Sequence, residues 1–287
     1  MPSHPVHQLL CPVCRDRLDY RQGAPRSLVC PQGHSFDAAR QGYFNFLVGK
    51  GTSFEADSAD MVAARGDFLS RGHYQPLAET IADAADAAMT SASPTVLDAG
   101  TGTGHYLRAV LDRHPAAGAI GLDISKFALR RAARMNPEAI NIVSDVWQPL
   151  PVADDAVDVV TVVFAPRNPV EFARVLRPAG MLLVVTPRPG HLEEVAGVIR
   201  LLAIEAAKEE RLVSSLGGHF DQESVQELDL DLVLPAKDVV SLALMGPAGH
   251  HLDRSSLPGM LASLQPVTKV SARFRITSFK PRMSRSR

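Results

Sequence analysis

The C-terminal two thirds of the chain alternate short apolar runs with amphipathic stretches. Continuous apolar runs rich in β-branched residues predict five strands, at Thr95–Asp98, Ala119–Asp123, Ile140–Val143, Val157–Phe164 and Met181–Thr186. Between them, apolar residues at helical spacing predict helices around Arg108, at Lys126–Met135 and at Pro169–Leu176. A strand that is apolar at every position is buried on both faces, as in a parallel sheet covered by helices. The pattern therefore predicts an α/β fold with a Rossmann-like, doubly wound sheet.

The N-terminal third has a different pattern. Residues 1–50 show little periodic apolar spacing, and they predict a small domain that cannot build a core from hydrophobic area alone. Residues 51–93 begin as a polar loop and continue into two helical patterns, at Asp57–Ser70 and Pro76–Met89, which predict a helical linker. Residues 94–287 are expected to form the main domain.

Beyond the fifth predicted strand the pattern is mixed. A long helical stretch runs from about Gly190 to about Leu216 and is followed by a polar segment. Strand-like runs at Asp238–Leu244 and Val267–Phe279 predict a final β-hairpin. The segment Arg273–Arg287 is basic, and we expect its outermost residues to be disordered.

Composition narrows the class of protein. The chain has 287 residues, of which 46% are hydrophobic, enough for one large core beside a small accessory domain. A formal net charge of -1 excludes a uniformly basic protein, so binding to nucleic acid must rest on local basic patches. No apolar run approaches the roughly 20 residues of a membrane span, and the N-terminus lacks a signal-peptide pattern. We therefore expect a cytoplasmic protein that does not bind membranes.

A glycine-rich loop follows the first strand of the main domain. The segment Asp98-Ala99-Gly100-Thr101-Gly102-Thr103-Gly104 leads into a helix, and its glycines permit a sharp turn and a close approach of the backbone to a ligand. A dinucleotide-binding loop has a different glycine spacing, and an acidic residue beside it would repel a pyrophosphate. Asp98 suits instead the ammonium of an amino-acid ligand, which favours S-adenosylmethionine over NAD. A tight strand-to-helix turn without a ligand is the alternative.

Two further strand ends fit the same cofactor. Asp123 ends the second strand and is placed for the hydroxyls of a ribose. Asp145 and Val146 follow the third strand and fit the region that contacts the adenine ring and its exocyclic amine. The agreement of three strand ends predicts a methyltransferase that depends on S-adenosylmethionine.

The cysteines are clustered near the N-terminus. Cys11-x-x-Cys14 is followed by Cys30-x-x-x-His34, which offers three thiolates and one imidazole. A closed set of this kind suits tetrahedral Zn²⁺ and leaves no open position for chemistry, so the spacing predicts a structural zinc site. A redox-active Cys-x-x-Cys pair and unrelated buried thiols are the alternatives.

Longer motifs extend from the cysteine cluster across nearly the whole chain. They are Gln32–Asp37, Arg40–Tyr43, Met61–Arg65, Gly72–Leu77, Gly121–Lys126, Phe164–Pro166, and Thr186–Pro187 with His191–Leu192. Together they resemble the RlmA family of 23S ribosomal RNA guanine-N1 methyltransferases. The runs Asp145–Trp147, Phe164–Pro169 and Met245–Pro247 are similar to the actinomycete branch that includes a tylosin-resistance methyltransferase. That branch modifies guanine 748 rather than the neighbouring guanine 745.

The resemblance implies further properties of the site. Tyr74, the Gly102–Thr103 step and His191 would touch the cofactor, with Tyr74 closing over it from the linker. The substrate would be a 23S ribosomal RNA hairpin that lines the peptide tunnel, which implies a link to macrolide resistance, and relatives suggest a homodimer. Without the resemblance, Tyr74 is interpreted as a half-buried linker aromatic and His191 as a residue at a helix N-terminus.

The chemistry of guanine N1 sets a further requirement. N1 carries a proton near neutral pH, so methyl transfer needs a general base or a group that stabilises the developing O6 anion. In this fold class the loop after the fourth strand opens towards the methyl group. We expect Asn168 or the Ala165–Pro166 backbone to orient the base and Arg167 to favour the O6 anion. An Arg167 that holds a phosphate or a surface acid fits the sequence equally well.

A target base in a hairpin must leave its stack to reach such a pocket. The zinc domain is too small and too closed for catalysis, so we expect it to recognise the RNA. The basic residues expected to contact phosphates are Arg15, Arg17, Arg21, Arg26, Arg40, Arg65 and Arg71.

Two other functions share parts of this pattern. A small-molecule methyltransferase acting on a quinone or a polyketide would have the same glycine loop but no reason to carry an N-terminal zinc module. A non-catalytic RNA-binding protein with a degenerate cofactor site is disfavoured because Asp98, the loop glycines and Asp123 are all intact.

Overall fold

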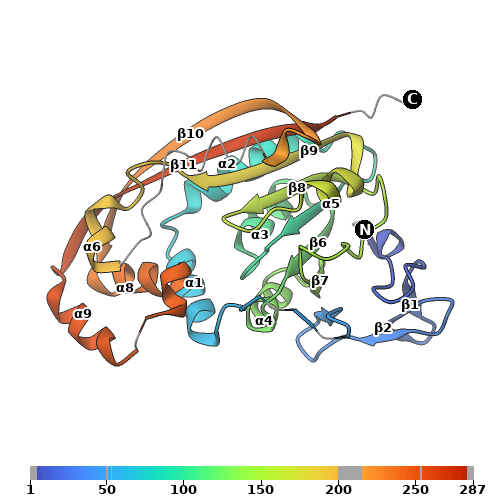
Figure 1. The fold of residues 1–287 in the computed structure, drawn as a ribbon, viewed down its shortest axis with the longest axis horizontal. Coiled ribbons are helices and arrows are strands. Elements are labelled where there is room, and N and C mark those ends of the chain that lie inside the picture. The colour runs from blue at the N-terminus through green and yellow to red at the C-terminus, as the bar shows by residue number, and fades with distance from the viewer. Residues whose placement is uncertain (1–4, 50, 53, 200–214, 253, 283–287) are drawn as a thin grey trace.

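A central sheet organises the molecule. The computed structural model describes residues 5–49, 51–52, 54–199, 215–252 and 254–282. Among these residues, eight strands form one sheet in the order β10-β11-β9-β8-β5-β6-β7-β4 (Figure 1). Their bounds are Phe44–Asn45 (β4), Thr95–Ala99 (β5), Gly118–Asp123 (β6), Ile140–Val143 (β7), Val157–Val163 (β8), Leu176–Pro187 (β9), Phe220–Pro235 (β10) and Val267–Pro281 (β11). Strands β4 to β9 are parallel, whereas β11 runs antiparallel to both β9 and β10.

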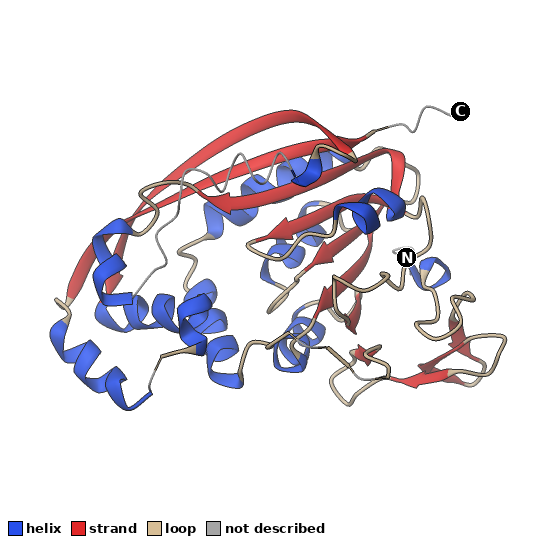
Figure 2. Ribbon diagram, in the orientation of Figure 1, coloured by secondary structure: helices blue, strands red, loops and turns tan. Residues whose placement is uncertain are grey.

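Helices cover both faces of this sheet (Figure 2). The α-helices are Ala59–Ser70 (α1), Gln75–Ala88 (α2), His105–Arg113 (α3), Lys126–Met135 (α4), Pro169–Val175 (α5), Ala196–Ile199 (α6), Ala236–Met245 (α8) and Leu257–Ser263 (α9). Short 3-10 turns lie at Pro5–Gln8, Glu193–Val195, Pro247–His250 and Arg254–Ser256. Residues of α2, α3 and α8 share one buried cluster, and residues of α5 and the N-terminal segment share another. Alternate residues of β9 enter the two clusters, Leu182 and Val184 in one and Leu183 and Val185 in the other, because side chains of a strand alternate between faces.

The sheet predicted from the apolar runs is confirmed. The strand Ile140–Val143 and the helix Lys126–Met135 match the expected bounds residue for residue. All positions of β5, β7 and β8 are buried, as continuous apolar strands require. β9 begins at Leu176, before the expected start at Met181, because Leu176 pairs with Val157 of β8.

The C-terminal hairpin forms, but one of its strands was assigned wrongly. Asp238–Leu244 lies in helix α8, where Asp238, Val239, Leu242 and Ala243 form a buried stripe at helical spacing. The partner of β11 is β10, within the segment that the sequence describes only as polar. Residues 221–227 of β10 are all exposed, whereas in its second half Leu228, Leu230 and Leu232 alternate with acidic residues and pack against the core. This alternation predicts a strand, but it was overlooked, and pairing with β11 along its whole length defines the strand.

The basic C-terminal segment is largely part of β11. Arg275 pairs with Glu227 and Arg282 pairs with Asp221, both across to β10. The acidic residues of β10 are thus matched by basic residues on its neighbour. Residues 283–287, which include the outermost part expected to be disordered, lie outside the described residues, as do residues 200–214 of the helical stretch expected after Gly190.

The N-terminal region is joined to the main sheet. A separate three-stranded sheet is made of Asp19–Arg21 (β1), Ala24–Val29 (β2) and Ser35–Asp37 (β3). Phe44 and Asn45 then form β4, which pairs in parallel with β7. Leu9, Phe44 and Phe46 are buried in the cluster that also holds Ile142 of β7. The last residues of the N-terminal segment therefore complete the edge of the large sheet.

A buried carboxylate ties the linker to the C-terminal part. Asp238 of α8 is 1% exposed, and its Oδ2 lies 2.7 Å from Nε2 of His73. Arg71, at the end of α1, forms an ion pair with the same carboxylate. Burial, followed by the charge of Arg71, lowers the pKa of His73. This cluster fixes the turn between α1 and α2, which carries Tyr74.

None of the helices in the described ranges is long and apolar enough to cross a membrane.

Candidate functional site

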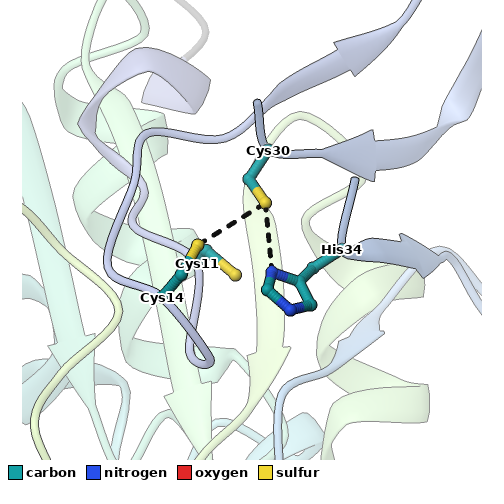
Figure 3. Close-up of side chains that lie close together, drawn as sticks. All are labelled: Cys11, Cys14, Cys30 and His34. Atoms are coloured by element: carbon teal, nitrogen blue, oxygen red, sulfur yellow. Dashed lines mark hydrogen bonds between the residues drawn. The ribbon is translucent and has the colours of Figure 1, made fainter. Parts of the chain in front are cut away.

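The four expected zinc ligands converge in the N-terminal sheet region. Figure 3 shows Cys11 and Cys14, from the turn before β1, facing Cys30 and His34, from the turn between β2 and β3. Their ligand atoms all lie within 4.8 Å of one another. The Sγ atoms of Cys14 and Cys30 are 3.6 Å apart, and Sγ of Cys30 lies 3.3 Å from Nδ1 of His34. A tetrahedral Zn²⁺ site has ligand–ligand edges of about 3.5–3.8 Å, so these four side chains are gathered at a spacing that suits one zinc ion.

Local geometry explains how this cluster forms. The backbone N–H of Arg15 donates to the carbonyl of Cys11, which closes the Cys-x-x-Cys turn. Arg15 itself has φ of 65°, an unusual conformation for a residue with a side chain, and its guanidinium donates to the carbonyl of Leu150 at 2.8 Å. Because Cys11 and Cys30 are also buried in the main core, the zinc centre and the large sheet form one packed unit.

The glycine loop lies at the carboxyl end of β5, with each glycine in a left-handed conformation. A Cβ on Gly100 would lie only 2.3 Å from the Cβ of Ala165, so glycine is what allows the loop after β8 to pack on this turn. A Cβ on Gly102 would meet nothing closer than the guanidinium of Arg65, at 3.8 Å. Thr103 is buried, and Gly104 is the N-cap of α3. Gly100 thus serves packing, whereas Gly102 is buried beneath Arg65 of the linker and donates its backbone N–H to Asp123.

Two carboxylates flank this loop. Asp98 is buried, accepts a hydrogen bond from the hydroxyl of Thr161 at 2.7 Å, and has no cationic partner among the described residues. Its burial raises the pKa to about 6. Asp123, at the end of β6, accepts hydrogen bonds from the backbone N–H of Gly102 at 2.8 Å and of Ser125 at 2.7 Å. Each oxygen of Asp123 keeps a second lone pair for a further donor, such as a hydroxyl.

The third strand end is also polar and buried. Asp145 follows β7, and its Oδ1 accepts from the backbone N–H of Trp147 at 3.0 Å. Its Oδ2 accepts from the hydroxyl of Thr52 at 2.8 Å. The neighbouring carbonyl of Val146 accepts from the side-chain amide of Asn168 at 2.9 Å. The expected adenine-contact region is therefore held between the linker and the loop after β8.

The linker lies over these strand ends. Arg65 of α1 forms an ion pair with Asp57 and donates to the carbonyl of Met245 at 2.6 Å. The hydroxyl of Ser125, beside Asp123, donates to the carbonyl of Asp57 at 2.8 Å. Sequence reasoning assigned Arg65 to phosphate binding and missed its place over Gly102. No local pattern marks it, because the contact joins segments that are distant in the chain.

Tyr74 and His191 meet on one aromatic ring. Each lies 5.0 Å from Phe274 of β11, measured between ring centroids, and Tyr74 is 2% exposed. Nδ1 of His191 accepts from the backbone N–H of Arg273 at 3.0 Å, and burial lowers the His191 pKa to about 4. His191 is therefore neutral near pH 7, with its proton on Nε2. The sequence pointed to Tyr74 and His191 only through the family resemblance, and Phe274 was not predicted.

The loop after β8 carries the two expected catalytic residues. The side-chain oxygen of Asn168 caps α5 by accepting from the N–H of Glu171 at 3.3 Å, so both ends of its amide are engaged. Arg167 is half-buried without a hydrogen-bonded partner among the described residues, and burial lowers its pKa. Phe164 begins the loop with φ of 54° and keeps 46% of its surface exposed. Strained backbone of this kind is concentrated at functional sites.

Two parts of the chain, the N-terminal region and the main sheet, match models of known protein families. Residues 9–49 match the family model described as "RlmA, N-terminal", and residues 96–180 match the model described as "Methyltransferase domain". The protein is 44% identical to a Micromonospora griseorubida protein named as a 23S rRNA (guanine-N(1)-)-methyltransferase, over 97% of this chain and 99% of that one. The chain belongs to the RlmA family of methyltransferases. A second relative, the 23S rRNA (guanine(748)-N(1))-methyltransferase of Streptomyces fradiae, is 42% identical over 98% of this chain and 99% of its own.

Family membership confirms the main assignments made from the residues. The fold is that of a class I methyltransferase with an N-terminal zinc ribbon, and the methyltransferase domain depends on S-adenosylmethionine. Among solved structures, the methyltransferase bound to the Haloferax volcanii Trm112 activator has a TM-score of 0.50 and 20% identity, covering 80% of this chain and 100% of that one, and it shows the fold alone. The described residues also fit the cofactor, because Asp98 is a buried carboxylate without a cationic partner among them and the oxygens of Asp123 can each accept a further hydrogen bond.

The metal centre yields a test of stability. Replacing one ligand, Cys30→Ser, should remove bound zinc and lower the midpoint of thermal unfolding, because Cys30 is both a ligand and part of the buried core. Zinc content by mass spectrometry and thermal unfolding would be measured together. His7→Ala changes an exposed histidine outside the cluster and should alter neither value. Retention of one zinc per chain in Cys30→Ser would contradict the assignment of Cys30.

The raised pKa of Asp98 yields a test of cofactor binding. The carboxylate ionises as the pH rises through about 6, and an ammonium partner favours the ionised form. Affinity for S-adenosylmethionine should therefore rise about tenfold from pH 5 to pH 7, with proton release on binding. Without cofactor the sign is opposite: the folded state holds the proton more tightly than the unfolded state, so Asp98 lowers stability as the pH rises from about 4 to about 6.

Calorimetry in two buffers of different ionisation enthalpy measures both affinity and proton release. Asp98→Asn should bind more weakly and lose the pH dependence. Asp83→Asn, an exposed acid on α2, is the matched control and should retain it. An unchanged pH profile in Asp98→Asn would rule out Asp98 as the group that meets the ammonium.

Proposed function

We propose that this protein transfers a methyl group from S-adenosylmethionine to N1 of guanine 748 in 23S ribosomal RNA. The observation that carries the proposal is the identity of 42% over 98% of the chain to the Streptomyces fradiae enzyme of that specificity. The identity extends over the zinc ribbon, the linker and the methyltransferase sheet together. A shared methyltransferase fold alone would leave the substrate open, because this fold serves many unrelated substrates.

The cofactor would be held by residues from four segments. Asp98 would meet its ammonium group, the Gly100–Gly104 loop its amino-acid part and Asp123 its ribose. Asp145 and Val146 would border the adenine, and Tyr74 with His191 would close the pocket around Phe274. When bound, S-adenosylmethionine supplies an electrophilic methyl group. The task of the protein is then to hold the guanine in line and exclude water.

Exposed aromatic side chains fit an unstacked RNA substrate. The exposed aromatic residues of the described chain are Phe54, Trp147 and Phe164, and all three lie at or over the carboxyl ends of β7 and β8. The rings of Phe54 and Trp147 have centroids 6.3 Å apart. Aromatic faces bind splayed bases by stacking, at about 1–3 kcal/mol per base. These residues supply such faces next to the carboxyl ends of the strands, where the cofactor would bind.

Deprotonation of guanine N1 would be assisted by the loop after β8. Arg167 is a half-buried guanidinium without an internal partner among the described residues, and it can stabilise the O6 anion that develops as N1 loses its proton. Asn168 is a positioning residue, since its amide bonds both the carbonyl of Val146 and the first turn of α5. The Ala165–Pro166 backbone, packed on Gly100, is the part of the loop nearest the cofactor turn.

The neighbouring guanine 745 is the competing target, and a small molecule is the competing class of substrate. Incubating the protein with tritiated S-adenosylmethionine and unmodified 23S ribosomal RNA, followed by primer extension, should give one stop at guanine 748, because N1 methylation blocks Watson–Crick pairing. A stop at guanine 745 would revise the specificity. Absence of label in the RNA would overturn the proposal.

Arg167 gives a sharper test of the chemistry. Arg167→Ala should lower kcat by about 10²–10³, as expected for loss of one anion-stabilising donor, with KM for RNA changed little. Arg167→Lys should recover part of the rate, and Arg113→Ala, an exposed arginine on α3, should have no effect. An increase in KM with kcat unchanged would show that Arg167 instead holds a phosphate.

A further inference from the structure

Helix α4 has an unusually basic exposed face. Its sequence, Lys126-Phe-Ala-Leu-Arg-Arg-Ala-Ala-Arg-Met135, contains four basic residues and no acidic one. Lys126, Arg130 and Arg134 are spaced four residues apart and so project from neighbouring turns. Its buried residues are Ala128, Leu129, Ala132 and Ala133. Like charges at this spacing destabilise a helix slightly, so an uncompensated basic face calls for a function.

The basic face borders a depression against the linker helix. This hollow of about 250 Å³ is lined by Ala59, Val62, Phe127, Arg130, Arg131 and Arg134. Gly66 of α1 leaves space for the guanidinium of Arg131, because a Cβ at that position would lie 2.6 Å from Nη1 of Arg131. The ring of Phe127 lies 5.3 Å from the guanidinium of Arg130 and 5.6 Å from the ammonium of Lys126. The cations are thus gathered around one aromatic ring.

These cations have no acidic partner within the described part of the chain. None of Lys126, Arg130, Arg131 and Arg134 forms an ion pair there, and Nε of Arg130 is buried without a hydrogen-bond partner. The nearby acids are already engaged: Asp57 by Arg65, Asp60 by Arg254 and Glu138 by Arg108. The charge of α4 therefore remains available to an external anion.

Most arginines expected to contact phosphates are engaged internally instead. Six of the seven donate to groups of the protein itself, namely Arg15, Arg17, Arg21, Arg26, Arg65 and Arg71. Arg65 and Arg71 hold the linker, and Arg15 holds the zinc ribbon to the sheet. Arg65 and Arg71 are also ion-paired, with Asp57 and Asp238, so their charge is less available to a phosphate than that of α4.

The position of α4 connects the parts of the molecule that face the substrate. Tyr43 from the N-terminal segment and Val62 from α1 pack with Ala128 and Leu129 of α4 in one buried cluster. Figure 1 shows α4 between α1 and the N-terminal strands. The helix also starts directly after Asp123 and Ser125, at the cofactor edge of the sheet. A chain crossing α4 would run from the N-terminal segment towards α1 of the linker, and the first turn of α4 lies beside the end of β6 that carries Asp123.

We propose that the face formed by Lys126, Arg130, Arg131 and Arg134 binds the phosphodiester backbone of the RNA substrate. This inference rests on the proposed function. Guanidinium groups bind phosphate oxygens through paired hydrogen bonds, and three of them line one small hollow. Contacts of this kind fix the register of the RNA without reading its sequence.

Salt dependence of RNA binding provides the test. The probes are a transcript of the target hairpin and full-length unmodified 23S ribosomal RNA. Replacing Arg130 and Arg134 by glutamine should remove two phosphate contacts, lower affinity roughly tenfold or more, and reduce the slope of log K against log salt by about 1.4–1.8. Binding of S-adenosylmethionine, zinc content and thermal unfolding should remain unchanged, because both side chains lie outside those sites.

Two controls make the result specific. The double variant Arg130→Lys with Arg134→Lys keeps the charges and should keep the wild-type slope. The double variant Arg113→Gln with Arg282→Gln removes two exposed, ion-paired arginines elsewhere and should also keep it. An unchanged slope and affinity in the glutamine variant would overturn this inference, and would be the result if α4 instead met an acidic protein surface. Failure of the wild-type protein to label RNA would count against the proposed function, not against α4 alone.

Discussion

The antiparallel insertion of β11 between β9 and β10 is the constraint on which the site depends. Its register places Phe274 opposite Pro187 at the end of β9, where Tyr74 from the linker and His191 from the following loop pack on one ring. Phe164, after β8, lies within 5.7 Å of the same ring. Arg275 of β11 and Arg282, which directly follows it, also form ion pairs with acidic residues of β10. One strand near the C-terminus thus gathers three loops into a single wall.

Elements held by interactions between residues close in sequence were mostly predicted correctly, whereas those that depend on distant residues were predicted less well. β7 and α4 were predicted to the residue because a continuous apolar run and an amphipathic helical pattern can both be recognised within the segment's own sequence. The first half of β10 has no local signal, because residues 221–227 are exposed and are held by the partner strand β11, whereas the alternation of Leu228, Leu230 and Leu232 with acidic residues in its second half was a signal that was missed. α8 was taken for a strand because a run of apolar residues fits either period when short.

The site shows the same division. The zinc ligands, the glycine loop and the acids at the strand ends follow from spacing and strand order. The roles of Arg65 and Phe274 do not, because each depends on contacts between segments far apart in the chain. The N-terminal segment was predicted as a small accessory domain, and the pairing of β4 with β7, which joins it to the edge of the large sheet, was not foreseen. Movement of the ribbon is therefore coupled to the strand that carries Asp145 at its end.

The polar contacts of the linker have a further consequence. Thr52 occupies one oxygen of Asp145, and the carbonyl of Asp57 is bonded beside Asp123. The linker is thus tied by single hydrogen bonds to residues at the ends of both β6 and β7, so its position over the sheet depends on how these two strand ends are arranged. A displacement of the linker would break both hydrogen bonds together, so the ends of β6 and β7 would respond to it as one unit.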